Sequence, residues 1–224
     1  MNFINQFTFL QNRKKAYYLL ITLVVIFLIL TAIVLLLPTT GFDLRFTERI
    51  QKVSNPALDV FMKSISWFGV TSVALAIVLG IALIFVIIHR WREAFFTMAT
   101  FLAPVITYGI KILINRPRPT EELVKIVEKA QHQSFPSGHT SFYVVFFGFM
   151  IFLLVRNGFF KRWFRYSLVV ILLIIIFSIP FSRIYLGAHW FTDVAAGFVL
   201  GILVLWALIE GYLYKPKSAS GINP

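Results

Sequence analysis

A histidine and an aspartate stand four residues apart in the segment Ser182-Arg183-Ile-Tyr-Leu-Gly-Ala-His189-Trp-Phe-Thr-Asp193. On a helix this spacing puts the Asp193 carboxylate beside the His189 imidazole, where it holds one ring nitrogen as N–H. The other nitrogen then keeps its lone pair and can act as a nucleophile or a base. Arg183 adds a guanidinium that can bind an oxyanion through two hydrogen bonds. A lone His–Asp pair is structural about as often as it is catalytic. Its role therefore has to be judged together with the neighbouring polar clusters.

A second polar cluster, Pro136-Ser137-Gly138-His139-Thr140, stands directly before a long apolar segment. Gly138 lets the backbone approach a ligand closely, and a helix N-terminus presents unpaired N–H groups and the positive end of its dipole. The cluster therefore predicts an anion-binding cradle, with His139 in the first turn as a proton donor. The plainer alternative is a Ser137 N-cap followed by an incidental histidine.

The third cluster is Lys111-Ile-Leu-Ile-Asn-Arg-Pro-Arg118-Pro119. Lys111 and Arg118 are about two helical turns apart, so both can face one way if the helix persists to about Asn115. The two prolines then end the helix. The alternative is that these cations snorkel to lipid headgroups. Arg116 receives no role from this pattern.

Together the clusters supply three cations, a backbone cradle and two histidines, which suit a dianionic tetrahedral group such as phosphate. The sequence has no paired carboxylates, no multi-histidine cluster and no cysteine that would hold Mg²⁺ or Zn²⁺. We therefore expect no metal and no cofactor. Lys and Arg would neutralise the phosphate charge, and a histidine would be the nucleophile.

Hydropathy indicates the elements that position these clusters. Of the 224 residues, 59% are hydrophobic and 13% are charged, which excludes disorder, a coiled coil and an ordinary soluble enzyme. The apolar segments are continuous rather than alternating, which argues against a membrane β-barrel. We expect an all-α polytopic membrane protein, a single domain over residues 1–224, with short interfacial helices. Its six transmembrane helices are expected at Ala16–Leu37, Phe68–Ile88, Ala94–Ile110, Ser141–Val155, Tyr166–Phe181 and Val194–Ile209.

Two segments between the spans are candidates for the interfacial helices. Residues 38–55 carry mixed charges among aromatic side chains and predict an interfacial helix or an ordered loop. Within residues 115–137, Thr120 followed by two glutamates is typical of a helix start, and apolar residues then recur at helical spacing over residues 123–130. In the last span, Gly197-Phe-Val-Leu-Gly201 is a GxxxG pattern that we expect to pack helices within the fold.

The cations indicate the orientation in the membrane. With the N-terminus in the cytoplasm, 11 of the 21 Lys and Arg residues fall inside with two acids, and the other 10 fall outside with seven acids. This asymmetry follows the positive-inside rule. We therefore expect a multi-pass protein of the cell membrane, with both termini cytoplasmic and all three polar clusters at the outer face. The net charge of +12 is then a topology signal and a match to anionic lipids, and no nucleic-acid partner is expected.

Read together, the three clusters resemble the signature motifs of the type 2 phosphatidic acid phosphatase superfamily. The motif region covers residues 111–193. This superfamily includes bacterial phosphatidylglycerophosphate phosphatase B, undecaprenyl diphosphate phosphatases and the soluble vanadium haloperoxidases, and the six-span layout is similar to that of its bacterial membrane members. The matching motifs are Lys111–x6–Arg118-Pro119, Pro136-Ser137-Gly138-His139 and Ser182-Arg183–x5–His189–x3–Asp193.

The resemblance implies a metal-independent phosphoric ester or diphosphate hydrolase with a phosphohistidine intermediate. His189 would attack phosphorus, and Asp193 would orient and stabilise it. His139 would protonate the leaving oxygen and then activate water. The remaining site residues would bind phosphate: Lys111, Arg118, Ser137, Gly138 and Arg183.

The resulting hypothesis is a membrane lipid phosphatase that acts on phosphatidylglycerol phosphate or undecaprenyl diphosphate, with phosphatidic acid as a further candidate, and without an obligate protein partner. A lipid phosphotransferase would use the same phosphohistidine and differ only in the acceptor. A vanadate-dependent oxidoreductase is disfavoured by the six membrane spans. A transporter is disfavoured because the ionisable residues gather at one interface rather than mid-membrane.

Overall fold

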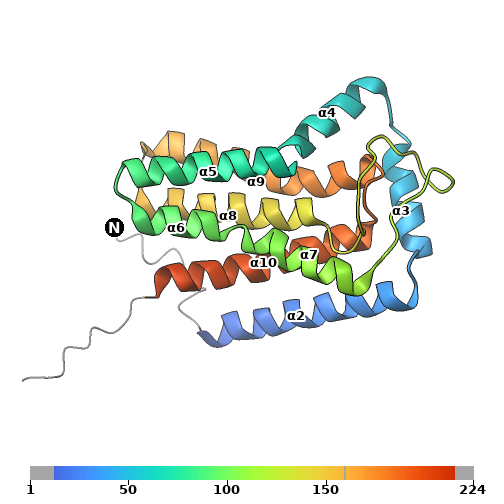
Figure 1. Ribbon diagram of the computed structural model, residues 1–224, viewed down its shortest axis with the longest axis horizontal. Helices are drawn as coiled ribbons and strands as arrows, with labels where there is room; N and C mark the ends of the chain where they lie inside the picture. The colour runs from blue at the N-terminus through green and yellow to red at the C-terminus, as the bar shows by residue number, and fades with distance from the viewer. Residues whose placement is uncertain (1–12, 159, 215–224) are drawn as a thin grey trace, which may run out of the picture.

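A computed structural model of the protein describes residues 13–158 and 160–214, and the regular structure in these ranges is entirely helical (Figure 1). The prediction of an all-α chain is confirmed over these ranges. The helices are α2 (Arg13–Leu36), α3 (Gly41–Gln51), α4 (Pro56–Trp67), α5 (Thr71–Ile87), α6 (Trp91–Ala99), α7 (Leu102–Ile114), α8 (Gly138–Asn157), α9 (Arg162–Tyr185) and α10 (Phe191–Leu213).

The helices form up to six candidate membrane spans among the described residues. Five stretches are each long and apolar enough to cross a membrane: α2, the pair α6–α7, α8, α9 and α10. The bent pair α4–α5 makes the sixth, so the expected number is met. The second span nevertheless differs from its predicted bounds, Phe68–Ile88. Its apolar helix begins at Thr71 and has only 17 residues, and α4 completes the span across a 47° bend.

The bend between α4 and α5 lies where the chain passes the first turn of α8. Gly69 stands at this bend, and a Cβ atom built there would lie 2.4 Å from the His139 ring and 2.9 Å from the Tyr143 ring. Only a residue without a side chain allows so close an approach. The bend therefore brings the α4–α5 connection against one of the predicted site residues.

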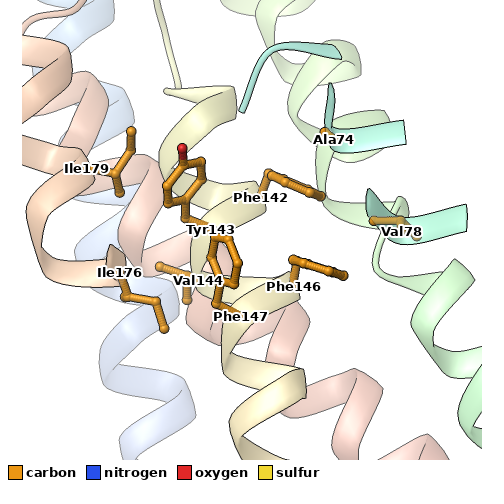
Figure 2. Packing of buried hydrophobic residues seen from close by; sticks show 9 residues of the cluster. All are labelled: Ala74, Val78, Phe142, Tyr143, Val144, Phe146, Phe147, Ile176 and Ile179. Atoms are coloured by element: carbon orange, nitrogen blue, oxygen red, sulfur yellow. The ribbon is translucent and has the colours of Figure 1, made fainter. Parts of the chain in front are cut away.

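The central helix of the bundle is α8. Of the apolar stretch of α8, 61% is buried by the rest of the protein, whereas only 6% of the apolar stretch of α2 is buried in this way. Dense packing on all sides fixes the position of α8, and so fixes the cradle at its N-terminus. Figure 2 shows the main cluster, in which side chains of α8 (Phe142, Tyr143, Val144, Phe146, Phe147) lie between those of α5 (Ala74, Val78) and α9 (Ile176, Ile179).

The GxxxG pattern packs α10 against α8. A Cβ atom at Gly197 would lie 2.6 Å from the carbonyl oxygen of Ser137, and one at Gly201 would lie 2.7 Å from the Cβ of Val144. Both glycines therefore permit a close helix contact inside the fold, as the sequence predicted.

One end of the bundle gathers α3, the long loop of residues 115–137 and the short turn of residues 186–190 (Figure 1). The α5–α6 and α8–α9 connections lie at the opposite end. The C-terminal ends of α7 and α9 and the N-terminal ends of α8 and α10 therefore meet at the same end of the protein. These are the four helix ends that carry the three polar clusters.

Residues 38–55 contain the helix α3, in agreement with the first of the two expectations for this segment. Thr40 is its N-cap and accepts a hydrogen bond from the backbone N–H of the third helical residue at 3.0 Å. Phe42 and Phe46 both contact Phe191 at the start of α10, with ring centroids 5.1 and 4.6 Å away. Aromatic packing thus docks α3 on the helix end that carries Asp193.

The interfacial helix predicted within residues 115–137 is wrong, because this segment is a loop of turns. After one turn closed by hydrogen bonds to the carbonyl of Thr120, its backbone bonds to other parts of the chain. The N–H of Val127 donates to the carbonyl of Leu186 at 3.0 Å, and the N–H of Lys125 donates to the side chain of Gln51 at 3.1 Å. These tertiary hydrogen bonds replace the i→i+4 ladder that the local pattern favoured.

Candidate active site

The structure brings all the residues predicted for the site to the same end of the bundle. Each motif contributes through a helix end or an adjoining loop, so the rigid bundle sets their relative positions. Lys111 lies in the last turn of α7, Arg118 in the loop 115–137, Ser137, Gly138 and His139 at the start of α8, Arg183 in the last turn of α9, His189 in the turn 186–190 and Asp193 in the first turn of α10.

His189 lies in the turn before α10 rather than on the helix, which begins at Phe191. The spacing still gives the expected contact, because the Asp193 carboxylate points back along the chain. Its Oδ2 atom accepts from the Trp190 N–H at 2.9 Å and lies 3.4 Å from His189 Nδ1. Arg118 Nη1 lies 3.2 Å from the other ring nitrogen, Nε2. A proton on Nδ1, facing the carboxylate, leaves the lone pair on Nε2.

The surroundings of His189 keep its imidazole neutral. The side chain is only 2% exposed. Burial, and then the positive charges of Arg118, Lys111 and Arg183, lower the pKa of His189 well below its ordinary value of 6.5. The ring is therefore in the neutral form that a nucleophile needs.

Lys111 and Arg118 are both held by backbone carbonyl oxygens of the loop 115–137. Lys111 Nζ donates to the carbonyls of Gln133 and Ser134, at 2.5 and 3.0 Å. Burial lowers the pKa of Arg118 to about 10, so this guanidinium is charged at neutral pH. The carbonyls that accept from Arg118 are those of Gln131, His132, Gln133 and Ala188.

Arg183 is almost fully buried, with 1% of its side chain exposed. Its Nη1 atom donates to Ser66 Oγ of α4 and to Glu128 Oε1 of the loop, each at 2.9 Å. Within residues 13–158 and 160–214, its Nε atom and the Nε2 atom of His139 are buried without a hydrogen-bond partner. Buried polar atoms of this kind are rare, and two of them among the predicted site residues suit a ligand.

The start of α8 has the geometry of an anion cradle. Ser137 is the N-cap: its hydroxyl accepts from the Thr140 N–H at 3.4 Å, and its own N–H donates to the carbonyl of Asp193 at 2.9 Å. The N–H groups of Gly138 and His139 belong to the first turn, which has no acceptors within the helix. The same contacts agree with an ordinary N-cap, so the cradle depends on the cations that surround it.

Sequence reasoning missed a buried ion-pair network behind the His189–Asp193 pair. The guanidinium of Arg116 donates to Asp193 Oδ1 at 2.5 Å and to Asp43 Oδ2 at 2.8 Å, and all three side chains are 0% exposed. Arg116 Nη1 also donates to Thr192 Oγ1 at 2.7 Å, and the Ser134 hydroxyl donates to Asp193 Oδ2. No local signal points to these partnerships, because Asp43 and Arg116 are separated by 73 residues.

The fold and the site define a multi-pass integral membrane protein with a histidine-containing, cationic site at one end of its bundle. The chain belongs to the PAP2 superfamily, whose sequence model matches residues 92–217 and so includes every predicted site residue. The resemblance found in the sequence is confirmed.

Two relatives and one solved structure are similar to this chain. Phosphatidylglycerophosphatase B of Bacillus subtilis (strain 168) is 28% identical over 166 residues, which is 74% of this chain and 80% of that protein. The lipid A 4'-phosphatase of Porphyromonas gingivalis is 29% identical over 181 residues, 72% of this chain and 69% of that protein. The crystal structure of a transmembrane PAP2-type phosphatidylglycerolphosphate phosphatase from Bacillus subtilis superposes with a TM-score of 0.76 at 23% identity, covering 88% of this chain and 98% of the other.

The structural likeness confirms the polytopic all-α fold. The family and its phosphatase members confirm the predicted enzyme class, a phosphoric ester hydrolase.

Proposed function

We propose that this protein is a membrane lipid phosphatase that forms a phosphohistidine on His189. The observation that carries the proposal is the environment of this imidazole: it is buried and neutral, its Nδ1 faces Asp193, and its Nε2 faces the guanidinium of Arg118. A lone pair aimed at a cationic group is placed to meet an anionic substrate bound by that group.

In the first step, His189 Nε2 attacks phosphorus, and a P–N bond forms as the P–O bond to the lipid breaks. His139, protonated once the phosphate dianion lies beside it, gives its proton to the leaving oxygen, and Asp193 stabilises the positive charge on the phosphorylated ring. In the second step, water attacks phosphorus and gives a proton to His139. The P–N bond then breaks, inorganic phosphate leaves, and His189 returns to its neutral form.

The phosphoryl oxygens would be held by Lys111, Arg118 and Arg183 together with the N–H groups at the start of α8. The loop carbonyls and Glu128 now satisfy part of this donor set. On phosphate binding, these donors would exchange the neutral carbonyl oxygens for charged phosphate oxygens. Hydrogen bonds with an ionised partner are roughly twice as strong as those between neutral groups.

A lipid substrate is supported by the position of the site at the ends of membrane spans and by the names of the relatives, which act on phosphatidylglycerol phosphate and lipid A. A phosphate bound there can leave its tail in the hydrocarbon, where each buried CH₂ contributes about 0.8 kcal/mol. Phosphatidylglycerol phosphate, undecaprenyl diphosphate and phosphatidic acid are the candidate substrates.

We propose that the site faces the outside of the cell. The charge asymmetry of the sequence supports this orientation, since cations such as Arg92 and Arg156 lie at the bundle end opposite the site. Both termini, predicted to be cytoplasmic, and the cations Lys215 and Lys217 lie outside the described residues. A Glu121→Cys variant should react with an impermeant maleimide in intact cells, and a Lys161→Cys variant should not. The reverse pattern would place the site on the cytoplasmic face.

The activity test uses purified protein in detergent and measures phosphate release from the three candidate lipids. We expect kcat/KM for the best lipid to exceed that for p-nitrophenyl phosphate by at least about 10²-fold, or roughly 2.7 kcal/mol. Equal efficiency on the soluble ester would contradict a lipid substrate. Recovery of the phosphoryl group on a second lipid would instead identify a phosphotransferase.

The nucleophile is tested by trapping. Protein quenched during turnover of a ³²P-labelled lipid should carry an acid-labile, base-stable label. His189→Ala should abolish both label and turnover, while His89→Asn, a change at a histidine in the α5–α6 connection at the opposite bundle end, should keep both. Turnover without His189 would end the phosphohistidine proposal.

A further inference from the structure

In the buried network of Asp43, Arg116 and Asp193, only Asp193 has a part in the reaction as described so far. Arg116 is the only cation in it, and it lies between two carboxylates with all three side chains fully buried. Burying one charge is costly unless it is paired, and removing one member of a buried pair costs more than the pair contributes. The arrangement therefore needs a reason beyond stability.

Arg116 alone would work against the proposed chemistry. A guanidinium hydrogen-bonded to Asp193 Oδ1 fixes that carboxylate, which leaves Oδ2 directed at His189 Nδ1. The same positive charge, however, offsets the negative charge with which Asp193 stabilises a phosphorylated ring.

Asp43 removes this conflict. Its Oδ2 accepts from Arg116 Nη2 at 2.8 Å, so the Asp43–Arg116 pair is neutral as a whole. Asp193 can then be oriented by Arg116 and still present its full negative charge to His189. With two carboxylates and one guanidinium, the network carries one net negative charge.

Asp43 also fixes the helix end that carries Asp193. Its Oδ1 atom accepts from the backbone N–H of Thr192 in the first turn of α10 at 2.9 Å, as a capping residue would. The Thr192 hydroxyl donates to the same carboxylate, at 3.1 Å to Oδ1 and 3.0 Å to Oδ2. Asp43 lies outside residues 92–217, the part of the chain that matches the superfamily. Helix α3 therefore reaches the ion-pair network through the side chain of Asp43.

We propose that Arg116 and Asp43 are positioning residues for the reaction: Arg116 orients Asp193, and Asp43 cancels the charge of Arg116 and locks the start of α10. This inference rests on the proposed phosphohistidine function. It makes α3 a working part of the site rather than an interfacial anchor.

The test is a double-mutant cycle with Asp43→Asn and Arg116→Met, in which kcat, KM and the pH dependence of kcat/KM are measured on the best lipid substrate. Asp43→Asn should lower kcat about tenfold and Arg116→Met by about 10²-fold, with KM changed less than kcat, since losses of this size are typical when a supporting partner is removed. In the double variant, Asp43→Asn should cost less than it does alone, because no guanidinium charge is left to cancel and only the contact with Thr192 is altered.

The pH profile separates positioning from simple loss of structure. The acid limb of kcat/KM reports the protonation of His189. Removing the Arg116 cation should move this limb to higher pH, and removing the Asp43 anion should move it to lower pH, each by at least about half a pH unit. The other charged and titratable groups around this site are unchanged in both variants: Lys111 of α7, Arg118 of the loop 115–137, His139 of α8, Arg183 of α9 with its partner Glu128, and Asp193 of α10.

Thr47→Ala is the matched control. Thr47 is a buried polar residue on the same helix, and its hydroxyl bonds only to the α3 backbone, at the carbonyl of Asp43. It should leave kcat and the pH profile unchanged even if the melting temperature falls. If Arg116→Met does not fold, kcat and the pH profile of Asp43→Asn still test the proposal.

Three results would overturn the inference: wild-type kcat and pH profile in Asp43→Asn, limb shifts of the same sign in both single variants, or additive losses in the double variant. His189→Ala is included in the same assay. If it is inactive while Asp43→Asn behaves as wild type, the inference alone fails. If His189→Ala turns over, the proposed function fails as well.

Discussion

The contact between Gly197 and the cradle allows a sharp test of how much precision the site needs. A methyl group added at Gly197 would lie 2.6 Å from the carbonyl oxygen of Ser137 and 3.2 Å from both its Cβ and its nitrogen. Backbone cannot rotate away as a flexible side chain can, so Ser137 would have to move by about half an ångström to reach a tolerable contact. Ser137 begins the helix whose N–H groups are proposed to hold the phosphate.

We expect Gly197→Ala to lower kcat by about ten- to a hundredfold, because a site has to be held within roughly half an ångström and a misplacement of about 1 Å can cost a factor of about 10². The overpacking should also destabilise the fold by about 1–3 kcal/mol. The assay is phosphate release from a lipid substrate by purified protein, with the melting temperature measured in the same detergent.

Two other glycines on the membrane helices separate the two effects. At Gly201 a methyl group would meet Val144 Cβ at 2.7 Å, one turn further from the cradle, so Gly201→Ala should lower the melting temperature similarly but keep kcat within about threefold. A methyl group at Gly80 would have no neighbour within 4 Å, so Gly80→Ala should lower neither the melting temperature nor kcat. The reasoning is refuted if Gly197→Ala has wild-type kcat, or if Gly201→Ala loses kcat in the same proportion.

Three further predictions concern the site itself. Turnover should survive excess EDTA, and orthovanadate should compete with substrate; complete loss on chelation that Mg²⁺ restores would contradict a metal-independent reaction. Because the pKa of His189 lies well below 6.5, its ring should become protonated only at lower pH, so the acid limb of kcat/KM should lie below pH 6.5. Comparing two lipid phosphates whose headgroups have different pKa values separates this limb from substrate ionisation. An acid limb above pH 6.5 that is the same for both substrates would contradict the prediction. Glu128→Gln should lower the inhibition constant of orthovanadate by about threefold to tenfold, since the carboxylate that competes for Arg183 is lost, whereas weaker vanadate binding would show that Glu128 helps to hold the anion.

The sequence predicted the parts of the site that depend on local spacing. The distance from His189 to Asp193 and the Ser137 N-cap are set by a few consecutive residues, and the structure contains both contacts. The position of the helix start differed from the expectation: α10 begins two residues after His189, so His189 is not on the helix. The contact forms because the Asp193 carboxylate points back along the chain toward His189. Short-range geometry of this kind tolerates an error of half a helical turn.

Predictions failed where tertiary contacts outweighed local preference. The pattern after Thr120 satisfies every local requirement of a short amphipathic helix. The helix does not form because the N–H of Val127 has a better-placed acceptor in Leu186, and because Lys125 is held by Gln51 of α3. An isolated helix of this length is marginal in any case, so a few long-range hydrogen bonds suffice to prevent it.

The loop formed in its place explains how three cations, the buried Lys111 and Arg183 and the half-buried Arg118, coexist before any phosphate is bound. Like charges at this end of the bundle would repel one another if they were left unpaired. The loop instead offers Lys111 the carbonyls of Gln133 and Ser134, and its Glu128 pairs with Arg183. The two carbonyls lie beyond residues 123–130, where the helix was expected, and they can accept from Lys111 because no helix uses them. The irregular backbone is therefore what keeps the donors oriented toward the anion site, and preorganised donors cost little reorganisation when the charge of the substrate arrives.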